Sequence, residues 1–299
     1  MRLFLGKHNL ISRKIKEVIL MKKTLSLVLS FAMLICCCLC IGTANVAIGS
    51  AESRYGIDVP VPYGGIIQGY ATDTVYYSRK DVSESYENPL NLPLYIASNI
   101  ENACCITAGG AIIGHFDRYY EELIPDHTVR VFLGIPTYGS QDAAVNAMHQ
   151  ELYKLMGSTS AGTSVEGYKK GMTSYVQNKG RSIEISSIYS NSSLNKSAYM
   201  SALQSGKLLT VFLDGFSVVS GVEIESFDGY DTISNTIVNG LHAVAAYGYR
   251  NIKYYDASDK LVQEDNYLLV HTGFASAGLS MIRLNKYTTV DDGYVINIT

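Results

Sequence analysis

The chain has 299 residues, 47% apolar and 17% charged, which excludes a disordered chain, a collagen-like repeat, a coiled coil and a polytopic membrane protein. Residues 1–51 hold seven Lys or Arg and one Glu, so the rest of the chain carries 17 basic and 26 acidic residues. This acidic body argues against nucleic acid and anionic lipid as partners, because both require clustered Lys and Arg.

Residues 1–51 are predicted to be a leader that contains a secretory signal peptide. Lys22 and Lys23 follow Met21, an apolar run covers residues 25–41, and small residues come after it. Residues 1–20 are basic and precede Met21, which is the more natural start of translation. We therefore expect that residues 1–20 result from a wrongly assigned start. A membrane anchor is the alternative, because the apolar stretch is nearly long enough to span a bilayer. We expect cleavage and secretion from a bacterium, with no stable membrane insertion afterwards and with retention at the cell surface left open.

Four of the six cysteines lie in this leader, and the body keeps only the adjacent Cys104 and Cys105. Adjacent cysteines close no loop, so no disulfide framework is expected. Thiols retained in an exported chain without such a role favour a chemical function for one of them. The two adjacent cysteines and the scattered histidines do not have the spacing of zinc ligands, so we expect no metal. No Gly-rich phosphate-binding loop follows a predicted strand, and we expect no organic cofactor.

The body is predicted to be an α+β domain over residues 94–299, preceded by an irregular extension or short pro-segment over 52–93. Helical patterns dominate first and strand patterns follow, which predicts a helical layer packed on a sheet. Capping residues and apolar periodicity place helices at 102–122, 140–157, 163–180 and 193–204. Runs rich in Val, Leu, Ile and Tyr place strands at 208–213, 241–249, 266–271, 279–284 and 294–298.

Cys104 and Cys105 stand where the first of these helices begins. A thiol at a helix N-terminus feels the positive end of the helix dipole, which favours the thiolate. Three glycines follow in the same helix and predict close packing against a neighbouring backbone: Gly109, Gly110 and Gly114. The alternative is a buried and inert pair of cysteines that fills space.

A thiolate nucleophile needs a histidine to hold and transfer the proton. The body offers His115, His127, His149, His242 and His271. The first three lie in or beside predicted helices, where a histidine usually has a structural role. His242 follows Gly240 and opens an apolar strand, which places its ring at a strand end. It is therefore the preferred partner, although a strand-end histidine bonded to a nearby carbonyl would give the same pattern.

The chain resembles bacterial C39-like cysteine peptidases of the papain superfamily in two features. One is the sequence Asn102-x-Cys104-x-x-Thr107-Ala-Gly, and the other is His242, which lies 138 residues after Cys104 at the start of its strand. Supporting segments are 116–118, 123–125 and 240–249, and the resemblance covers roughly residues 93–290. It implies a papain-like fold with the Cys helix packed on an antiparallel sheet that carries the histidine. It also implies a peptide or protein substrate, Cys104 as nucleophile and His242 as general base and acid. Cys105 remains an alternative nucleophile.

The chain departs from this family at two positions. The family's orienting Asn or Asp corresponds to the segment 270–274, where His271 is the candidate for the third role. The Gln that usually supports the oxyanion has no counterpart, and Asn99 or Asn102 would have to donate instead, although Asn102 also fits a helix cap.

A binding or adhesion module on a degenerate protease fold is the competing interpretation. The unusual third residue favours it. The 23 Tyr also suit contact surfaces, because a tyrosine offers a large apolar area with a polar tip.

Overall fold

The computed structural model describes residues 59–60, 66–127, 130–132, 135–137, 141–274 and 279–299. The chain divides into two units, Met1–Glu52 and Ser53–Thr299, and the second unit contains all of the described residues. The predicted leader over residues 1–51 lies outside them. No helix in the described part of the chain is both long and apolar enough to cross a membrane.

The four helices predicted from the sequence are present, and each is shorter than predicted. They are α2 (Cys104–Asp117), α3 (Ala143–Leu155), α4 (Val165–Asn178) and α5 (Lys196–Gln204), with short 3-10 turns η1 (Glu121–Leu123) and η2 (Gly221–Glu223). Side-chain caps fix three of the starting points. Asp142, Ser164 and Asn195 each accept a hydrogen bond from a backbone N–H in the first turn of α3, α4 and α5.

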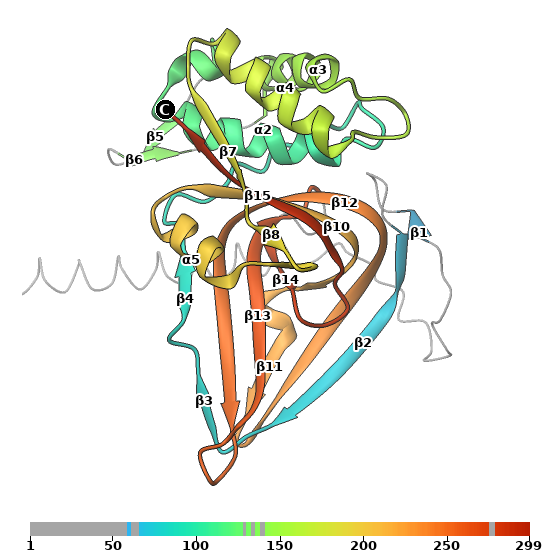
Figure 1. Cartoon of the computed structure of the whole chain (residues 1–299), viewed down its shortest axis with the longest axis vertical. Helices are drawn as coiled ribbons and strands as arrows, with labels where there is room; N and C mark the ends of the chain where they lie inside the picture. The colour runs from blue at the N-terminus through green and yellow to red at the C-terminus, as the bar shows by residue number, and fades with distance from the viewer. Residues whose placement is uncertain (1–58, 61–65, 128–129, 133–134, 138–140, 275–278) are drawn as a thin grey trace, which may run out of the picture. The chain divides into compact units, whose positions relative to one another are not determined.

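A large antiparallel sheet forms the rest of the described structure (Figure 1). Its strands are β1 (Val59–Pro60), β2 (Ile66–Tyr76), β3 (Arg79–Asp81), β4 (Ser85–Glu87), β7 (Ile183–Ser187), β10 (Leu208–Val219), β11 (Ile224–Phe227), β12 (Tyr230–Tyr255), β13 (Leu261–His271), β14 (Leu279–Arg283) and β15 (Val290–Ile298). Two small hairpins lie apart from it, β5 (Arg130–Phe132) with β6 (Ile135–Thr137), and β8 (Tyr189–Ser190) with β9 (Ser193–Leu194).

The sheet is organised around β12, which is 26 residues long. Its first half pairs with β2 and β11, and its second half pairs with β13, β3 and β4. The strand β10 pairs with β12 on one side and with β15 on the other. Helices and an antiparallel sheet make the domain α+β, as the sequence predicted.

The prediction that residues 52–93 are irregular is wrong for the part that is described. Residues 66–76 form β2 and pair with β12 from Tyr230 to Asn239, so this segment belongs to the sheet. The side chain of Val75 is buried by this pairing. The partner strand lies more than 150 residues later in the chain, and a pairing of that range leaves little signal in the local sequence.

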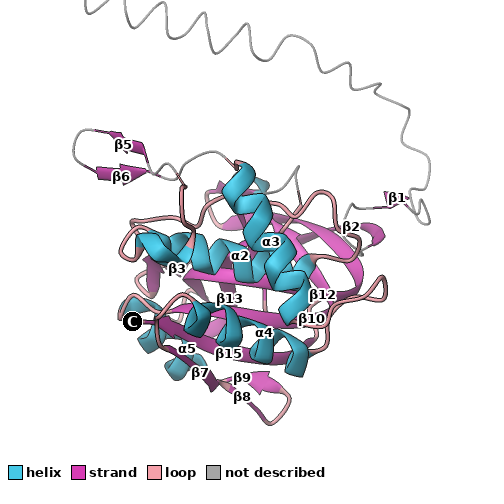
Figure 2. Ribbon diagram, turned by 90° about the horizontal axis from the view of Figure 1, so that it is seen from above, coloured by secondary structure: helices cyan, strands magenta, loops and turns pink. Residues whose placement is uncertain are grey.

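Helices cover both faces of the sheet, and the side chains of β12 alternate between the two sides. Ala243 and Ala245 belong to one apolar cluster together with α2, whereas Val244 and Ala246 belong to a second cluster with α5. This alternation is the period of two that a strand imposes. Figure 2 shows α2, α3 and α4 lying over the strands. The fourth helix therefore does not share the single helical layer that the sequence predicted.

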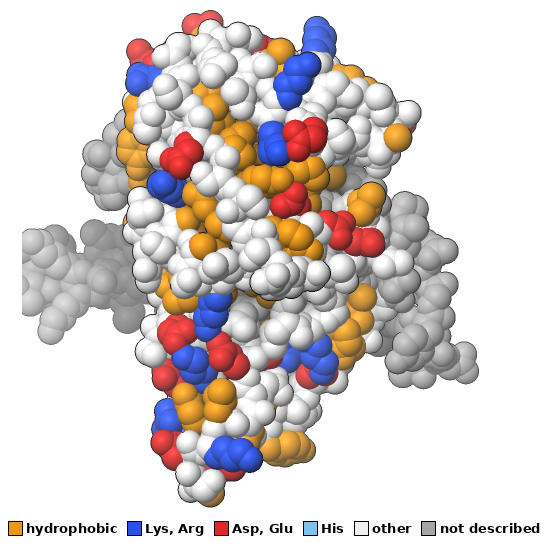
Figure 3. Space-filling view, viewed as in Figure 1, with side chains coloured by type: hydrophobic (Ala, Val, Ile, Leu, Met, Phe, Trp, Pro, Cys, Tyr) orange, Lys and Arg blue, Asp and Glu red, His pale blue; other side chains and the backbone are white. Residues whose placement is uncertain are grey.

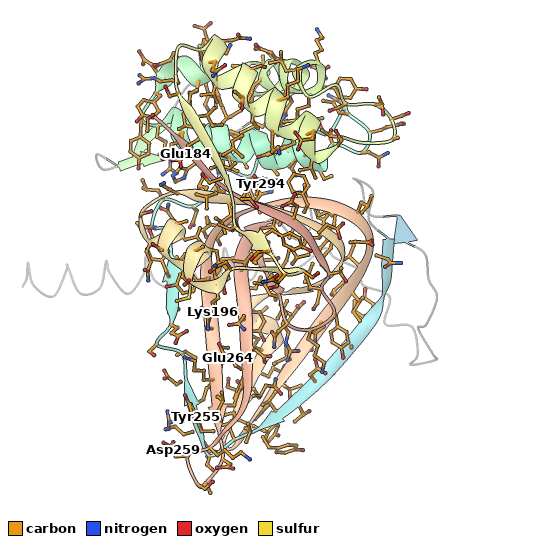
Figure 4. The ribbon with its side chains drawn as sticks, viewed as in Figure 1. Glu184, Lys196, Tyr255, Asp259, Glu264 and Tyr294 are labelled. Carbon is orange, nitrogen blue, oxygen red and sulfur yellow. The ribbon has the colours of Figure 1, made fainter. Side chains whose placement is uncertain are left out.

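Ion pairs connect residues of the sheet both in its interior and at its outer surface. Arg283 is buried and forms ion pairs with Asp265, which is fully buried, and with Asp73. On the outer surface Lys196 of α5 pairs with Glu264 of β13, and both are labelled in Figure 4. On the face in Figure 3, acidic and basic side chains are interspersed over the sheet.

Candidate active site

The thiol of Cys104 lies at the first residue of α2. The residue before it, Ala103, takes the N-cap position and offers no side-chain acceptor. The backbone N–H groups of the first helical turn have no acceptor within the helix, so they remain available to a group outside it. They also carry the positive end of the helix dipole, which favours an anion at this place.

Close packing holds α2 in position, but its glycines contact neighbouring side chains and not the neighbouring backbone that was predicted. A Cβ atom added at Gly110 would lie 2.5 Å from Nε2 of His149 on α3, which is closer than real contacts allow. A Cβ at Gly114 would collide with the ring of Tyr95. All residues of α2 after Cys104 are buried. This packing fixes the position of the first turn of α2 and therefore of the Cys104 thiol.

His242 lies on β12 directly opposite Leu213 of β10. Its ring is buried and contacts two aromatic rings, which also stack on each other with 6.2 Å between their centroids. The Phe216 ring lies 5.2 Å from it at 15°, and the Phe274 ring lies 4.8 Å from it at 24°. These stacked contacts restrict rotation of the imidazole. Neither phenylalanine was singled out from the sequence.

The hydrogen bond of Nε2 fixes the tautomer of His242. This atom lies 2.6 Å from the backbone carbonyl oxygen of Thr272. A carbonyl oxygen only accepts hydrogen bonds, so Nε2 carries the proton and donates it. Nδ1 is then left with a free lone pair. This buried atom has no hydrogen-bond partner of good geometry among the described residues, so it is available as a base.

The pKa of the Cys104 thiol lies well below its usual value. The largest cause is a hydrogen bond from the neighbouring thiol of Cys105. Burial acts in the opposite direction, and the hydrogen bond and charge of His242 and the backbone N–H of Ala243 then lower the pKa further. The thiol and the imidazole are close enough for His242 to affect the pKa of Cys104, although Nδ1 has no partner of ideal hydrogen-bond geometry among the described residues. Such contacts in free enzymes tighten when substrate binds.

Cys105 supports its neighbour. Its side chain is buried, and its pKa is raised well above the usual value, first by the interaction with Cys104 and then by burial. Its sulfur also lies 3.8 Å from the carbonyl oxygen of Thr163. One S–H cannot donate to both groups at once, and an anionic sulfur is the stronger acceptor. The opposite shifts make Cys104 the member of the pair that loses its proton more readily and Cys105 the member that retains it.

His271 does not hold the position that the sequence predicted for it. The group that accepts from His242 is the carbonyl of the next residue, Thr272. Nδ1 of His271 accepts the backbone N–H of Gly273 at 3.0 Å, and burial lowers the pKa of this histidine to about 4. The reason is geometric. His271 is the last residue of β13 and its side chain is committed to the turn that follows.

The two asparagines proposed as oxyanion donors have other positions. Asn102 lines the same cavity as Cys104, but an N–H of its side-chain amide donates to the backbone oxygen of Ser160. Its backbone has φ of 50°, a left-handed conformation that asparagine tolerates better than most residues. Asn99 lines a separate depression with Glu101 and Tyr153. The side-chain amide of Asn102 is thus already used in a hydrogen bond, and Asn99 does not line the cavity that holds Cys104.

A cavity of about 440 Å³ opens in front of the thiol and the imidazole. One wall is the segment 161–165 between α3 and α4, and the other walls come from β10, β12 and β15. Its lining is mostly apolar and includes Val165, Phe212, Leu213 and Leu241. Within the described residues, no group of three or more His, Cys, Asp or Glu side chains is arranged to hold a metal ion.

The remaining histidines lie outside this cavity. His149 and His115 are buried near α2, and burial lowers the pKa of each to about 4. The charge of Arg118 contributes to the shift of His115. His127 bonds to Tyr95 and Asp142. These positions are structural, as the sequence predicted for histidines in and near helices.

Comparisons with known proteins were made for the whole chain. No family model matches it, and a search of curated proteins finds no relative. Among solved structures, the chain is similar to the peptidase domain of Streptococcus ComA, a bi-functional ABC transporter involved in a quorum-sensing pathway. The identity is 10%, the alignment covers 67% of this chain and 93% of that one, and the TM-score is 0.31. A TM-score this low does not assign a fold.

Proposed function

We propose that this protein is a cysteine peptidase with a papain-like arrangement of its site, in which Cys104 is the nucleophile and His242 the general base and acid. The observation that carries the proposal is the buried imidazole beside a thiol of lowered pKa at a helix start. Thr272 takes the orienting role through its carbonyl oxygen. A neutral carbonyl stabilises the imidazolium less than a carboxylate would, but it selects the same tautomer.

The chemistry follows from these positions. The thiolate of Cys104 attacks an amide carbonyl, and the oxygen that becomes negative is stabilised by backbone N–H groups at the start of α2. Nδ1 of His242, which takes the proton of the Cys104 thiol when the thiolate forms, gives this proton to the leaving amine, and a thioester to Cys104 remains. A water then enters, loses a proton to Nδ1 and attacks the thioester. This step releases the acid and restores the thiol pair.

The test compares two cysteine variants, Cys104→Ser and Cys105→Ser, with the parent on a mixture of casein peptides analysed by mass spectrometry. We expect Cys104→Ser to abolish hydrolysis, because an alcohol at this place is not ionised near neutral pH. Cys105→Ser should retain measurable cleavage, since the serine can still donate a hydrogen bond to the thiolate. Equal hydrolysis by Cys104→Ser and the parent would reject the assignment.

Export is a further part of the proposal and rests on the sequence of residues 1–51 alone. Expression of the full chain in a secreting bacterium tests it. The N-terminus of protein recovered from the medium or the cell surface should lie after the apolar run at 25–41. A protein that keeps residues 1–51 and stays inside the cell would contradict it.

A further inference from the structure

One acidic side chain stands among the apolar residues of the catalytic cavity. Asp291 lines this cavity together with Cys104, His242 and Leu213, and it is the one Asp, Glu, Lys or Arg among the described residues that do so. The cavity also receives the unpartnered Nδ1 of His242, whose ring is buried. The acidic group therefore faces the same space as the groups that would cleave a peptide.

A bulge in β15 explains why Asp291 points into the cavity. In the pairing of β10 with β15, Phe212 lies opposite Asp292 and Leu213 lies opposite Val290. Asp291 is thus the extra residue that has no partner on β10. Such a bulge breaks the alternation of side chains and redirects one of them. Leu213 pairs with His242 on its other side, so Asp291 lies across a single strand from the catalytic imidazole.

The charge of Asp291 is not compensated within the protein. Asp291 is exposed to solvent at the cavity, and its pKa is raised by a partial loss of hydration and by the charges of Asp214 and Asp292. Asp292 accepts a hydrogen bond from Tyr294, which Figure 4 shows between the helices and the sheet. No ion pair of Asp291 or Asp214 with a Lys, Arg or His occurs within the described residues. A carboxylate that is crowded by like charges gains free energy from an incoming cation.

The walls beside Asp291 suit a long aliphatic stem. Leu241, which is exposed, and Val165 contribute apolar surface to the cavity that Cys104 and Asp291 also line, and the buried Leu213 lies at the same cavity. A lysine or arginine side chain places an aliphatic chain on such a surface and keeps its charged group at the end. An acidic substrate residue would instead meet a like charge in a partly apolar space.

We propose that this cavity selects peptide substrates carrying a lysine or arginine at one of the three residues before the cleaved bond, with Asp291 as the residue that determines this specificity. The inference rests on the proposed peptidase function. The aliphatic part of the substrate residue packs on Leu213 and Val165, and its cation pairs with Asp291. The acidic body of the protein attracts the same basic peptides over a longer range.

The experiment uses three sets of fluorogenic peptides that are identical except at one residue. Lysine, norleucine or glutamate occupies, in turn, each of the three residues before the cleaved bond. Norleucine matches the aliphatic stem of lysine without its charge. The parent should cleave the lysine peptides about tenfold more efficiently in kcat/KM than the norleucine peptides at one of the three positions, and the glutamate peptides least.

Two variants identify the residue responsible. Asp291→Asn keeps the size of the side chain and should remove the preference for lysine, with little change for norleucine. Asp259→Asn is the matched control, because Asp259 pairs with Arg79 at the end of the sheet far from the helices (Figure 4), and it should keep the preference. An unchanged alkylation rate at Cys104 shows that Asp291→Asn retains an intact site.

The outcomes separate the two proposals. If the parent cleaves lysine and norleucine peptides equally well at all three positions, or if Asp291→Asn keeps the lysine preference, the specificity is rejected and the peptidase stands. If the parent cleaves none of these peptides or the casein peptides, the peptidase assignment fails and the specificity fails with it.

Discussion

Nε2 of His242 donates a hydrogen bond to the backbone oxygen of Thr272 at 2.6 Å. In the proposed mechanism, a main-chain atom thus performs the task that a side chain of Asn or Asp performs in the Ser-His-Asp and Cys-His-Asn sites. Because the oxygen belongs to the backbone, no substitution at residue 272 removes it. The orientation of the imidazole is open to mutation only through the two rings that stack on it.

Phe274 is the residue through which this orientation can be tested. Its ring lies 4.8 Å from the imidazole, and Phe274→Leu removes the flat surface that holds it. We expect kcat to fall by about tenfold to a hundredfold with little change in KM, because a small displacement of a catalytic group costs this much. Phe227→Leu is the control, since this exposed phenylalanine stacks on Tyr230 in the sheet. Full activity in Phe274→Leu would show that stacking does not position His242.

Acid should destabilise the fold through its buried histidines. His149, His115 and His271 each have a pKa of about 4 in the folded protein, below the ordinary value of 6.5. Between these values the unfolded chain binds more protons than the folded one. The stability from each neutral histidine is therefore fully present above pH 6.5, and it is lost as the pH falls toward 4.

Replacement of one histidine measures this effect. The free energy of unfolding of the parent should fall between pH 7.5 and pH 5 by about 2 kcal/mol more than that of His149→Leu. Burial raises the pKa of Asp117 to about 6, which opposes the loss, so Asp117→Asn should steepen it. Urea unfolding at the two pH values provides the numbers. Identical pH dependence in the parent and His149→Leu would contradict the assigned shift.

Arg283 should be among the most sensitive positions for stability. Its guanidinium bonds to both carboxylate oxygens of Asp265 and to Asp73, in the interior of the sheet. Arg283→Met leaves a fully buried carboxylate without its cation, and we expect a loss of about 3–5 kcal/mol in unfolding free energy. The double variant with Asp265→Asn should recover part of this loss. A double variant as unstable as the sum of the two single ones would exclude coupling of the pair.

The sequence was sufficient for the features that local chemistry determines. The predicted starts at residues 163 and 193 lie within two residues of the observed N-caps of α4 and α5, Ser164 and Asn195, and the glycines of α2 indicated its close packing. Pairings over long distances were missed. The segment 66–76 is rich in Ile, Thr and Tyr, a strand signal that was available, but nothing in the local sequence identifies β12 as its partner. The full length of β12 escaped prediction for the same reason.

The site was only partly predictable. Residues that act through a distinctive side chain were found from the sequence, whereas a role of the backbone was not. Cys104 and His242 were found because a thiol and an imidazole are recognisable side chains in informative places. Every residue has a backbone carbonyl, so the sequence gives no indication that the carbonyl of Thr272 has a special role. Asp291 depends on a bulge, and the offset between Phe212 and Leu213 is visible only in the pairing of β10 with β15.

The pH dependence of Cys104 alkylation by iodoacetamide tests the central claim most directly. Rates are followed by mass spectrometry of the peptide that contains both cysteines, with Cys105→Ser as the background that isolates Cys104. With His242 present, the plot of alkylation rate against pH should have its inflection well below the ordinary thiol pKa of about 8.5. His242→Ala should move this inflection to higher pH and slow the reaction at pH 6. An inflection at the ordinary value, unchanged by His242→Ala, would contradict the thiolate–imidazole pair.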